Sequence, residues 1–327
     1  MLLKVRNLSK SFQNGTRAIE DLSFDIPAGK ITAFLGFNGA GKTTSLKIIL
    51  NLLLPDEGKI YFENKLLKND FTPLLKQTGV VLESARNMFY ALTPMENFIY
   101  WGAQRGLNKK VAQKNGLELL EKFDLLSKKD TVIFELSRGM QQIIAICCAL
   151  ISKPKFLVLD EPTLGLDIEA VETVERILKT LASEGVAILL TTHELAFAQR
   201  IADQILLIKK GRLIYSGSKA DCLDKFNQEK FITVQFSQAL SNNQRAVLES
   251  IAKIISINNT TYQLVLSNRK NLSHLLKFLT QFKLMDLKTK NKGLNEVVDF
   301  YMKGKNEDGS IKSGISAWIN HIPTLFI

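Results

Sequence analysis

The sequence contains few cysteines and no metal-binding cysteine pattern. Only three of its 327 residues are cysteine. Cys147 and Cys148 are adjacent within an apolar run, and Cys222 lies far from them. Adjacent residues of a helix point in different directions and no C-x-x-C spacing occurs, so we interpret all three as small buried apolar side chains. The absence of a disulfide framework is consistent with a reducing cytosol.

Two further absences concern the membrane. No stretch of the sequence approaches the roughly 18 consecutive apolar residues that a membrane-spanning helix requires. The N-terminal residues 1–6 lack the apolar core of a signal peptide. If the chain acts at a membrane, we therefore expect it to do so by binding another protein that spans it.

Acidic residues are outnumbered. There are 43 lysines and arginines against 32 acidic residues, which gives a net charge of +11. A basic surface favours an anionic partner such as a nucleotide, a nucleic acid or the inner face of a membrane. The lysines are scattered, which argues against a dedicated nucleic-acid arm. An ordinary solvated basic surface explains the charge equally well.

The order of the predicted elements indicates an α/β fold. Buried strands are predicted over Ile31 to Leu35 and Phe156 to Leu159, and helical stretches alternate with such strands. A helix is predicted over Thr44 to Leu53, with a stop at Pro55. Residues from about 84 to 150 are mostly helical in pattern. Within them, Thr93 to Glu96 carries a helix-start signature with a capping-box glutamate.

The pattern changes near Ser218. Residues 219–304 predict the order strand, helix, strand, strand, helix, strand, similar to a small ferredoxin-like unit, followed by a last helix over Leu294 to Met302. Residues 305–327 are apolar in part but broken by a proline, and we expect a loosely ordered tail or, alternatively, a docking segment. We therefore predict one large domain over residues 1–218, a small α+β domain over 219–304 and a tail. No internal repeat is present.

Residues 36–43 carry the clearest chemical motif. They match the phosphate-binding pattern G-x-x-x-x-G-K-[ST], between a buried strand and a helix. The glycines let backbone N–H groups converge on phosphate oxygens, and the helix N-terminus favours the anion. Lys42 supplies a charge to the β- and γ-phosphates, and the Thr43 hydroxyl can ligate Mg²⁺. The candidate nucleotide-binding residues are Gly36, Phe37, Asn38, Gly39, Ala40, Gly41, Lys42, Thr43 and Thr44.

A second motif ends the strand over Phe156 to Leu159. Asp160 stands at the strand tip, where it can hold the Mg²⁺ shell. Glu161 follows, where it can polarise an attacking water or accept its proton. An apolar strand that ends in two acids is weak evidence alone, because surface acids often end strands. Its pairing with a phosphate loop more than a hundred residues upstream makes it strong.

Three further segments accompany the phosphate loop and the strand that ends in Asp160. The chain contains Leu136-Ser137-Arg138-Gly139-Met140-Gln141-Gln142, then Pro162-Thr163-Leu164-Gly165-Leu166-Asp167, then Leu189-Leu190-Thr191-Thr192-His193. Together with the two motifs above, they resemble the signature motif, D-loop and switch histidine of ABC ATPases, over about residues 2 to 217. The resemblance implies a P-loop NTPase cassette with a RecA-like core, an antiparallel β subdomain and a helical signature subdomain. It also implies hydrolysis of ATP with Mg²⁺ as cofactor.

The resemblance assigns roles to further residues. It implies that Ser137 and Gly139 of one chain close on the γ-phosphate held by a second chain, in a head-to-tail homodimer or heterodimer with two ATP molecules between the halves. A helix N-terminus with a serine hydroxyl suits an anion on physical grounds as well. Asp167 belongs to the nucleotide site through the D-loop. His193 is implied to contact the γ-phosphate, so that Glu161 and His193 form the catalytic pair.

Two positions follow by resemblance alone. Phe12 matches the aromatic residue that stacks on adenine. Glu83 matches a position usually held by Gln, where an oxygen can still reach Mg²⁺ or water and where the family couples the ATP site to the membrane subunit.

The chain also departs from the common pattern of the family. Arg138 and Met140 replace commoner signature residues and, like Glu83, resemble the ABC-2 type exporter branch, which moves drugs, antimicrobial peptides, lipids or polysaccharides. Ile143 stands where an Arg is frequent, and Leu164 stands where a small polar residue is usual. These last two bear on the turnover rate and not on ATP binding.

The leading hypothesis is the ATPase subunit of an exporter, bound peripherally at the cytoplasmic face of the cell membrane to a separate transmembrane permease. A soluble ABC protein acting on nucleic acid or ribosomes is the first alternative. Such proteins usually carry two cassettes or a long coiled-coil insertion, which this chain lacks, so no nucleic-acid partner is expected. The second alternative is an ATP-binding regulator with weak hydrolysis, and the intact Lys42, Asp160, Glu161 and His193 argue against it.

Overall fold

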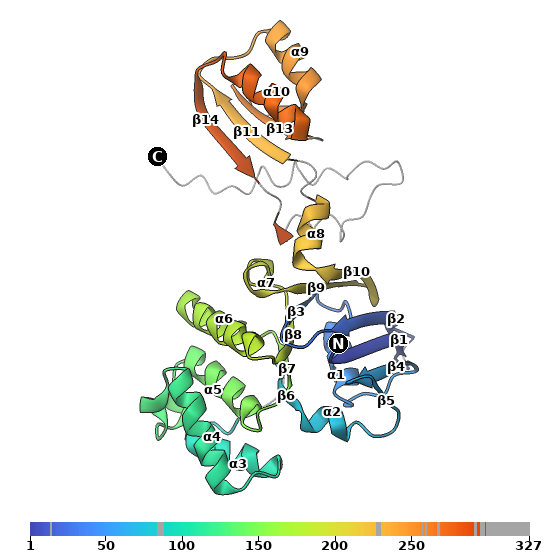
Figure 1. Cartoon of the computed structure of the whole chain (residues 1–327), viewed down its shortest axis with the longest axis vertical. Coiled ribbons are helices and arrows are strands. Elements are labelled where there is room, and N and C mark those ends of the chain that lie inside the picture. The colour runs from blue at the N-terminus through green and yellow to red at the C-terminus, as the bar shows by residue number, and fades with distance from the viewer. Residues whose placement is uncertain are drawn as a thin grey trace. The chain divides into compact units, whose positions relative to one another are not determined.

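The computed structural model of the chain describes residues 1–13, 15–83, 88–226, 230–256, 258, 260–266, 269–290, 293, 294 and 298. The chain divides into two compact units, Met1–Lys219 and Ala220–Ile327 (Figure 1). Among the described residues, no helix combines the length and the apolar character that crossing a membrane requires. Cys147, Cys148 and Cys222 are free and buried, as predicted, and burial raises the pKa of the Cys147 and Cys148 thiols.

The first unit contains an antiparallel sheet of four strands, in the order β2-β1-β4-β5. Leu3, Val5 and Leu8 of β1 are buried in one hydrophobic cluster with Phe34 and Leu46, which belong to the central sheet and the helix after it. The antiparallel sheet and the central sheet therefore share one core. The strands of the antiparallel sheet are β1 (Leu3–Ser11), β2 (Arg17–Ile26), β4 (Glu57–Phe62) and β5 (Lys65–Leu67).

The central sheet has six strands, in the order β10-β9-β3-β8-β7-β6. All neighbouring pairs are parallel except β10 with β9. Every residue of β3, β7 and β8 is buried, as expected for a parallel sheet covered on both faces. The strands are β3 (Ile31–Leu35), β6 (Thr78–Val81), β7 (Phe156–Asp160), β8 (Ala187–Thr192), β9 (Gln204–Lys209) and β10 (Arg212–Ser218).

Helix α1 (Lys42–Ile49) follows the phosphate loop. The prediction of a helix over Thr44 to Leu53 is wrong at both ends. The helix begins two residues earlier because the loop glycine Gly41 is already its N-cap. It ends at Ile49 because Asn51 adopts a left-handed φ of 55°, which turns the chain back so that the Leu53 N–H donates to the Lys47 carbonyl.

The region predicted to be helical over about 84–150 forms the helical subdomain, although residues 84–87 lie outside the described part. Thr93 caps α3, and its capping box with Glu96 is confirmed. Besides α1, the helices of the first unit are α2 (Thr72–Lys76), α3 (Pro94–Gln104), α4 (Lys109–Lys122), α5 (Arg138–Leu150), α6 (Ile168–Ser183) and α7 (Leu195–Ile201), with short 3₁₀ turns at Leu126–Lys128 and Ile133–Glu135. The three parts of the expected cassette are therefore present.

The second unit is a small α+β domain. Its sheet has the order β12-β13-β11-β14 with all neighbours antiparallel, and α9 and α10 cover one face (Figure 1). Strand and helix order together are those of a split βαβ unit. The elements are α8 (Lys219–Phe226), which spans the boundary, β11 (Lys230–Phe236), α9 (Asn242–Ile251), β12 (Lys253–Ser256), β13 (Thr261–Leu266), α10 (Arg269–Leu279) and β14 (Leu284–Lys290). The helix expected over Leu294 to Met302 lies largely outside the described residues, and the tail over 305–327 lies entirely outside them.

Helices α3 and α4 approach closely through glycine. A Cβ added to Gly116 of α4 would lie 2.4 Å from Cδ2 of Phe98, whose side chain is fully buried. A Cβ added to Gly102 of α3 would lie 2.6 Å from Cβ of Ala112. The two glycines therefore set the distance between these helices.

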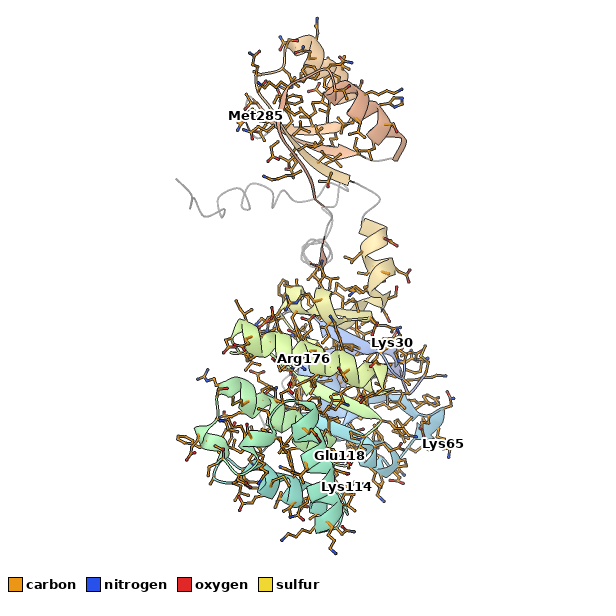
Figure 2. All side chains as sticks on the ribbon, turned by 60° about the vertical axis from the view of Figure 1, so that its left-hand side comes forward. Lys30, Lys65, Lys114, Glu118, Arg176 and Met285 are labelled. Atoms are coloured by element: carbon orange, nitrogen blue, oxygen red, sulfur yellow. The ribbon has the colours of Figure 1, made fainter. Side chains whose placement is uncertain are left out.

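The variant Gly116→Ala should be less stable than the wild type. Alanine favours a helix over glycine by about 1 kcal/mol, but overpacking against the buried ring costs about 1–3 kcal/mol. Lys114→Ala is the matched control on the same helix. Its side chain, labelled in Figure 2, is 77% exposed, and its free energy of unfolding should change by less than about 0.5 kcal/mol. Urea unfolding checks both, and a more stable Gly116→Ala would contradict the close approach.

Candidate functional site

The site is built at one edge of the central sheet, where parallel strands end. Leu35 at the end of β3 pairs with Thr192 of β8, and Asp160 at the end of β7 pairs with Thr191. The phosphate loop, the two acids and His193 come directly after these strands. Because carboxyl ends of parallel strands meet at the same edge, the sheet brings these three segments together.

The phosphate loop is seated against the neighbouring backbone. A Cβ added to Gly36 would lie 2.6 Å from the Ile208 carbonyl oxygen, and one added to Gly41 would lie 2.5 Å from that of Ala18. Gly41 also has a φ of 111°, which disfavours residues with a side chain. The loop is further tied down by a hydrogen bond from the Gly211 N–H to the Ala40 carbonyl oxygen, at 2.9 Å.

The outer side of this loop is open to a ligand. Phe37, Asn38, Gly39 and Thr43 are exposed, whereas Ala40 is buried and Thr44 is half-buried. Phe37 is 62% exposed, which is unusual for a phenylalanine. These exposed residues of the loop, the Thr43 side chain included, are therefore accessible to a ligand.

Lys42 supplies the positive charge of the site. It is buried, and its ammonium donates to the Gly36 carbonyl oxygen at 2.7 Å. Burial lowers the pKa of Lys42, while the charges of Glu161, Asp160 and Glu83 oppose that shift. The three predicted carboxylates thus lie close enough to Lys42 to act on its charge.

Asp160 is held by Thr191. Asp160 is only 5% exposed, and the Thr191 hydroxyl donates to its Oδ1. The same hydroxyl accepts a hydrogen bond from the Glu161 N–H at 3.1 Å. One threonine therefore orients both acids.

Glu161 has a strained backbone and a close histidine. Its φ is 49°, a left-handed conformation that costs energy in a residue other than glycine and often marks a functional site. Its side chain is 9% exposed, and its Oε2 lies 2.9 Å from Nδ1 of His193, which is itself 51% exposed. The predicted catalytic pair is therefore in contact, with the carboxylate held at the sheet edge.

The oxygen atoms of the site suit a divalent cation whose other ligands are phosphate oxygens and water. One ammonium stands near three carboxylates, which leaves a surplus of negative charge. Among the described residues, no group of three or more His, Cys, Asp or Glu could hold a metal ion. Mg²⁺ is usually bound by one or two carboxylates together with phosphates and water, so Asp160 and Glu83, with the Thr43 hydroxyl, suit it.

The signature residues are not brought to the phosphate loop of the same chain. Ser137 is the N-cap of α5, and its hydroxyl accepts from the Met140 N–H. Figure 1 shows α5 and α1 on opposite sides of strands β6 and β7. The helix that Ser137 caps and the helix that follows the phosphate loop thus lie on different sides of these two strands.

The remaining predicted residues lie around the site. Asp167 is the N-cap of α6, and its carboxylate accepts from the Ala170 N–H at 2.8 Å, so it has a structural role at this position. Phe12 follows β1 and is 42% exposed, and its stacking on adenine stays a prediction. Glu83 is exposed. Ile143 is buried in α5 and Leu164 is 47% exposed.

Sequence reasoning assigned no role to Thr191, which binds both acids. The available signal was a polar β-branched residue at the end of an otherwise apolar strand. The sequence also did not indicate that the phosphate loop packs against the carbonyl groups of Ala18 and Ile208. Nothing local in the sequence marks a residue that contacts a loop through its carbonyl group alone.

Thr191→Val should destabilise the protein by about 1–3 kcal/mol, because it leaves the buried Asp160 carboxylate without its donor. Thr163→Val is the matched control. Thr163 is equally buried, and its hydroxyl has no hydrogen-bond partner among the described residues, so the same change should be neutral or stabilising. Urea unfolding distinguishes the two. Equal effects of both substitutions would contradict the role given to Thr191.

Comparison with known proteins is consistent with this site. The family model described as ABC transporter matches residues 19–164. The L-cystine import ATP-binding protein TcyC of Bacillus subtilis is 34% identical, over 66% of this chain and 90% of its own. The energy-coupling factor transporter ATP-binding protein EcfA2 of Streptococcus thermophilus is 31% identical, over 72% and 88%. These relatives do not support the expectation of an exporter, since the first is an import protein by name.

Solved structures agree on the fold. An ATP-binding subunit of an ABC transporter superposes with a TM-score of 0.61 at 30% identity, covering 69% of this chain and 93% of its own. A dimeric ATP-binding cassette in a post-hydrolysis state, bound to ADP and phosphate, gives 0.59 at 27% identity and covers 66% and 98%. The sequence motifs, the site at the sheet edge and these relatives agree, and the chain belongs to the ATP-binding-cassette family of transporter ATPases, which bind and hydrolyse ATP.

Proposed function

We propose that this chain is the ATP-hydrolysing subunit of a membrane transporter and works as a head-to-tail dimer of cassettes. The observation that carries the proposal is the division of the site. Lys42, Asp160 and Glu161 lie at one edge of the sheet, whereas α5, the helix that Ser137 caps, lies on the other side of β6 and β7 from α1 (Figure 1). A second cassette in the opposite orientation supplies the missing half. The dimeric relative bound to ADP and phosphate supports the pairing of two cassettes.

In this proposal, each group acts on one part of the reaction. The loop N–H groups and Lys42 bind and orient the phosphates, which is most of the catalysis in phosphoryl transfer. The Glu161 carboxylate accepts a hydrogen bond from the attacking water and takes its proton. His193 holds Glu161 through the 2.9 Å contact and is exposed enough to meet the γ-phosphate.

Magnesium is proposed as the cofactor. Thr43, Asp160 and Glu83 would hold it, and bound Mg²⁺ would neutralise charge on the phosphate oxygens. Thr191 keeps the Asp160 carboxylate in place for this task.

The transmembrane part is proposed to be a separate permease, with this chain bound at the cytoplasmic face of the membrane. The described residues contain no helix suited to crossing a bilayer, and the named relatives are ATP-binding proteins of transporters. Energy from ATP would pass to the permease through the helical subdomain next to Glu83.

Export is proposed as the direction of transport. The support is the resemblance of Glu83, Arg138 and Met140 to the ABC-2 type exporter branch. The α+β domain at the C-terminal end of the chain also resembles an extension found in that group. The import relative named above speaks against export, so the direction depends on an experiment.

Replacing the proposed base tests the mechanism. Glu161→Gln should lower ATP turnover by about 10²- to 10⁴-fold, because the amide cannot accept the proton of the attacking water. ATP binding should persist, and an ATP-dependent dimer should accumulate in gel filtration. Phosphate release with ATP and Mg²⁺ measures the turnover.

Lys42→Ala is the contrasting variant, and it should lose ATP binding and form no such dimer. If the wild type binds ATP but releases phosphate no faster than Glu161→Gln, even with membranes added, the chain acts as a regulator and the mechanism above is wrong.

Transport direction can be tested in cells that express the chain with its transmembrane partner. Export predicts survival at higher concentrations of antimicrobial peptides from a panel that includes lantibiotics, and predicts that Glu161→Gln removes this resistance. Uptake of radiolabelled L-cystine is measured in the same cells. ATP-dependent accumulation of L-cystine that is lost in Glu161→Gln would contradict export and favour import.

A further inference from the structure

Strand β14 lies at one edge of the sheet in the second unit. The strand order is β12-β13-β11-β14, and among the strands that the structure describes β14 pairs only with β11. β14 has seven residues, whereas β12 at the other edge has four. Proteins usually keep exposed edge strands short, because the unpaired N–H and C=O groups of a longer one can pair with another strand. The outer edge of β14 is therefore suited to the addition of a strand.

Apolar side chains are exposed on the same strand. Within the described part of this sheet, the large apolar side chains that are exposed are Met285, at 65%, and Leu287, at 42%, and both belong to β14. Met285 is labelled in Figure 2. Leu287 lies opposite Val234 of β11, which is fully buried, so Leu287 continues the core-facing side of the sheet to its margin. An added strand would cover apolar surface as well as backbone groups.

Two charged side chains make β14 complementary to a second copy of itself. Asp286 and Lys288 form an ion pair at 2.6 Å, and as alternate residues of a strand they lie on one face. The hydrogen bond from Lys288 lowers the pKa of Asp286, so this carboxylate is charged at neutral pH. In an antiparallel pair of two copies with the two-fold axis at Leu287, Asp286 of each copy lies opposite Lys288 of the other.

The neighbouring registers are unfavourable. Side chains that lie opposite one another across two antiparallel strands share a face, so the two-fold axis of such a pair passes through a residue position. An axis at Asp286 sets two carboxylates opposite one another, and an axis at Lys288 sets two ammonium groups opposite one another, which destabilises the pair. A lone lysine on an edge strand hinders pairing, but here the acid two residues away converts the lysine into a partner for the second copy.

We propose that the second unit binds a second copy of this chain through the outer edge of β14, in an antiparallel pairing centred on Leu287 that continues the sheet from one copy into the other. The pairing needs no nucleotide, because no residue of the ATP site takes part. A contact along one strand is smaller than the about 800 Å² per partner of a standard interface, so the dimer is weak and depends on concentration. It raises the effective concentration of the two first units for one another, which favours the ATP-dependent pairing of cassettes proposed above.

The experiment is sedimentation velocity of the full chain without nucleotide, over a series of protein concentrations. We expect the wild type to pass from monomer to dimer as the concentration rises. Leu287→Lys places two ammonium groups at the two-fold axis and should raise the Kd of the dimer at least about tenfold. The matched control is Leu276→Lys on α10, where the leucine is 47% exposed, and it should leave the Kd unchanged.

A charge exchange tests whether the pairing is between chains. Asp286→Lys leaves two lysines on the strand and Lys288→Asp leaves two acids, so each variant alone sets like charges opposite one another and should dimerise less than the wild type. An equimolar mixture of the two variants should form a mixed dimer, because every lysine then faces an acid. An ion pair that acts only within one strand gives no mixed dimer, so variants that stay monomeric when mixed would overturn the proposal.

Lys42→Ala separates this contact from the pairing of cassettes. It should lose the ATP-dependent dimer and keep the nucleotide-free one, so failure of the proposed ATPase mechanism leaves this inference intact. A wild type that stays monomeric at every concentration without nucleotide would assign the edge to another segment of the chain or to another protein and would overturn the proposal. Equal Kd values for the wild type and Leu287→Lys would place the contact elsewhere and overturn it as well.

Discussion

The geometry of the ATP site in the first unit depends on the register of the buried parallel strands. Leu35, Asp160 and Thr192 end three adjacent strands at one level, and the catalytic segments begin one or two residues later. Since all three strands are buried along their whole length, a slip of one residue would turn their side chains to the other face and separate the site. The packed core thus holds the chemistry in place more firmly than any contact inside the site.

Close backbone approaches are the second means by which the fold positions the site. The phosphate loop is pressed against the carbonyl groups of Ala18 and Ile208, and α5 is pressed against α6 at Gly139 and Ala170. Each approach depends on a glycine that no larger residue can replace without moving backbone. The glycines of this chain therefore have different tasks: those of the phosphate loop pack the nucleotide site against its neighbours, and Gly139 sets the distance between α5 and α6.

The proposed dimer divides the nucleotide site between two chains. Burial and local hydrogen bonds complete the half that contains Lys42, Asp160 and Glu161. Ser137 and Gly139 stand at the start of α5, which lies on the other side of β6 and β7 from α1 (Figure 1). In the proposed dimer, the start of α5 of one chain meets the phosphate loop of the other.

Local sequence determined the phosphate loop, the strand that ends in Asp160 and the capped helix at Thr93, because each depends on residues close together in the chain. The order of such local motifs along the chain determined the family. Tertiary structure alone decided the end of α1 at Asn51, the bridging role of Thr191 and the close approach of Gly139 to Ala170. These features join residues 30 or 31 positions apart or depend on one left-handed residue. Hydrophobic periodicity and motif spacing carry no information on which distant side chains meet, since that is fixed only when the sheet and the helices pack.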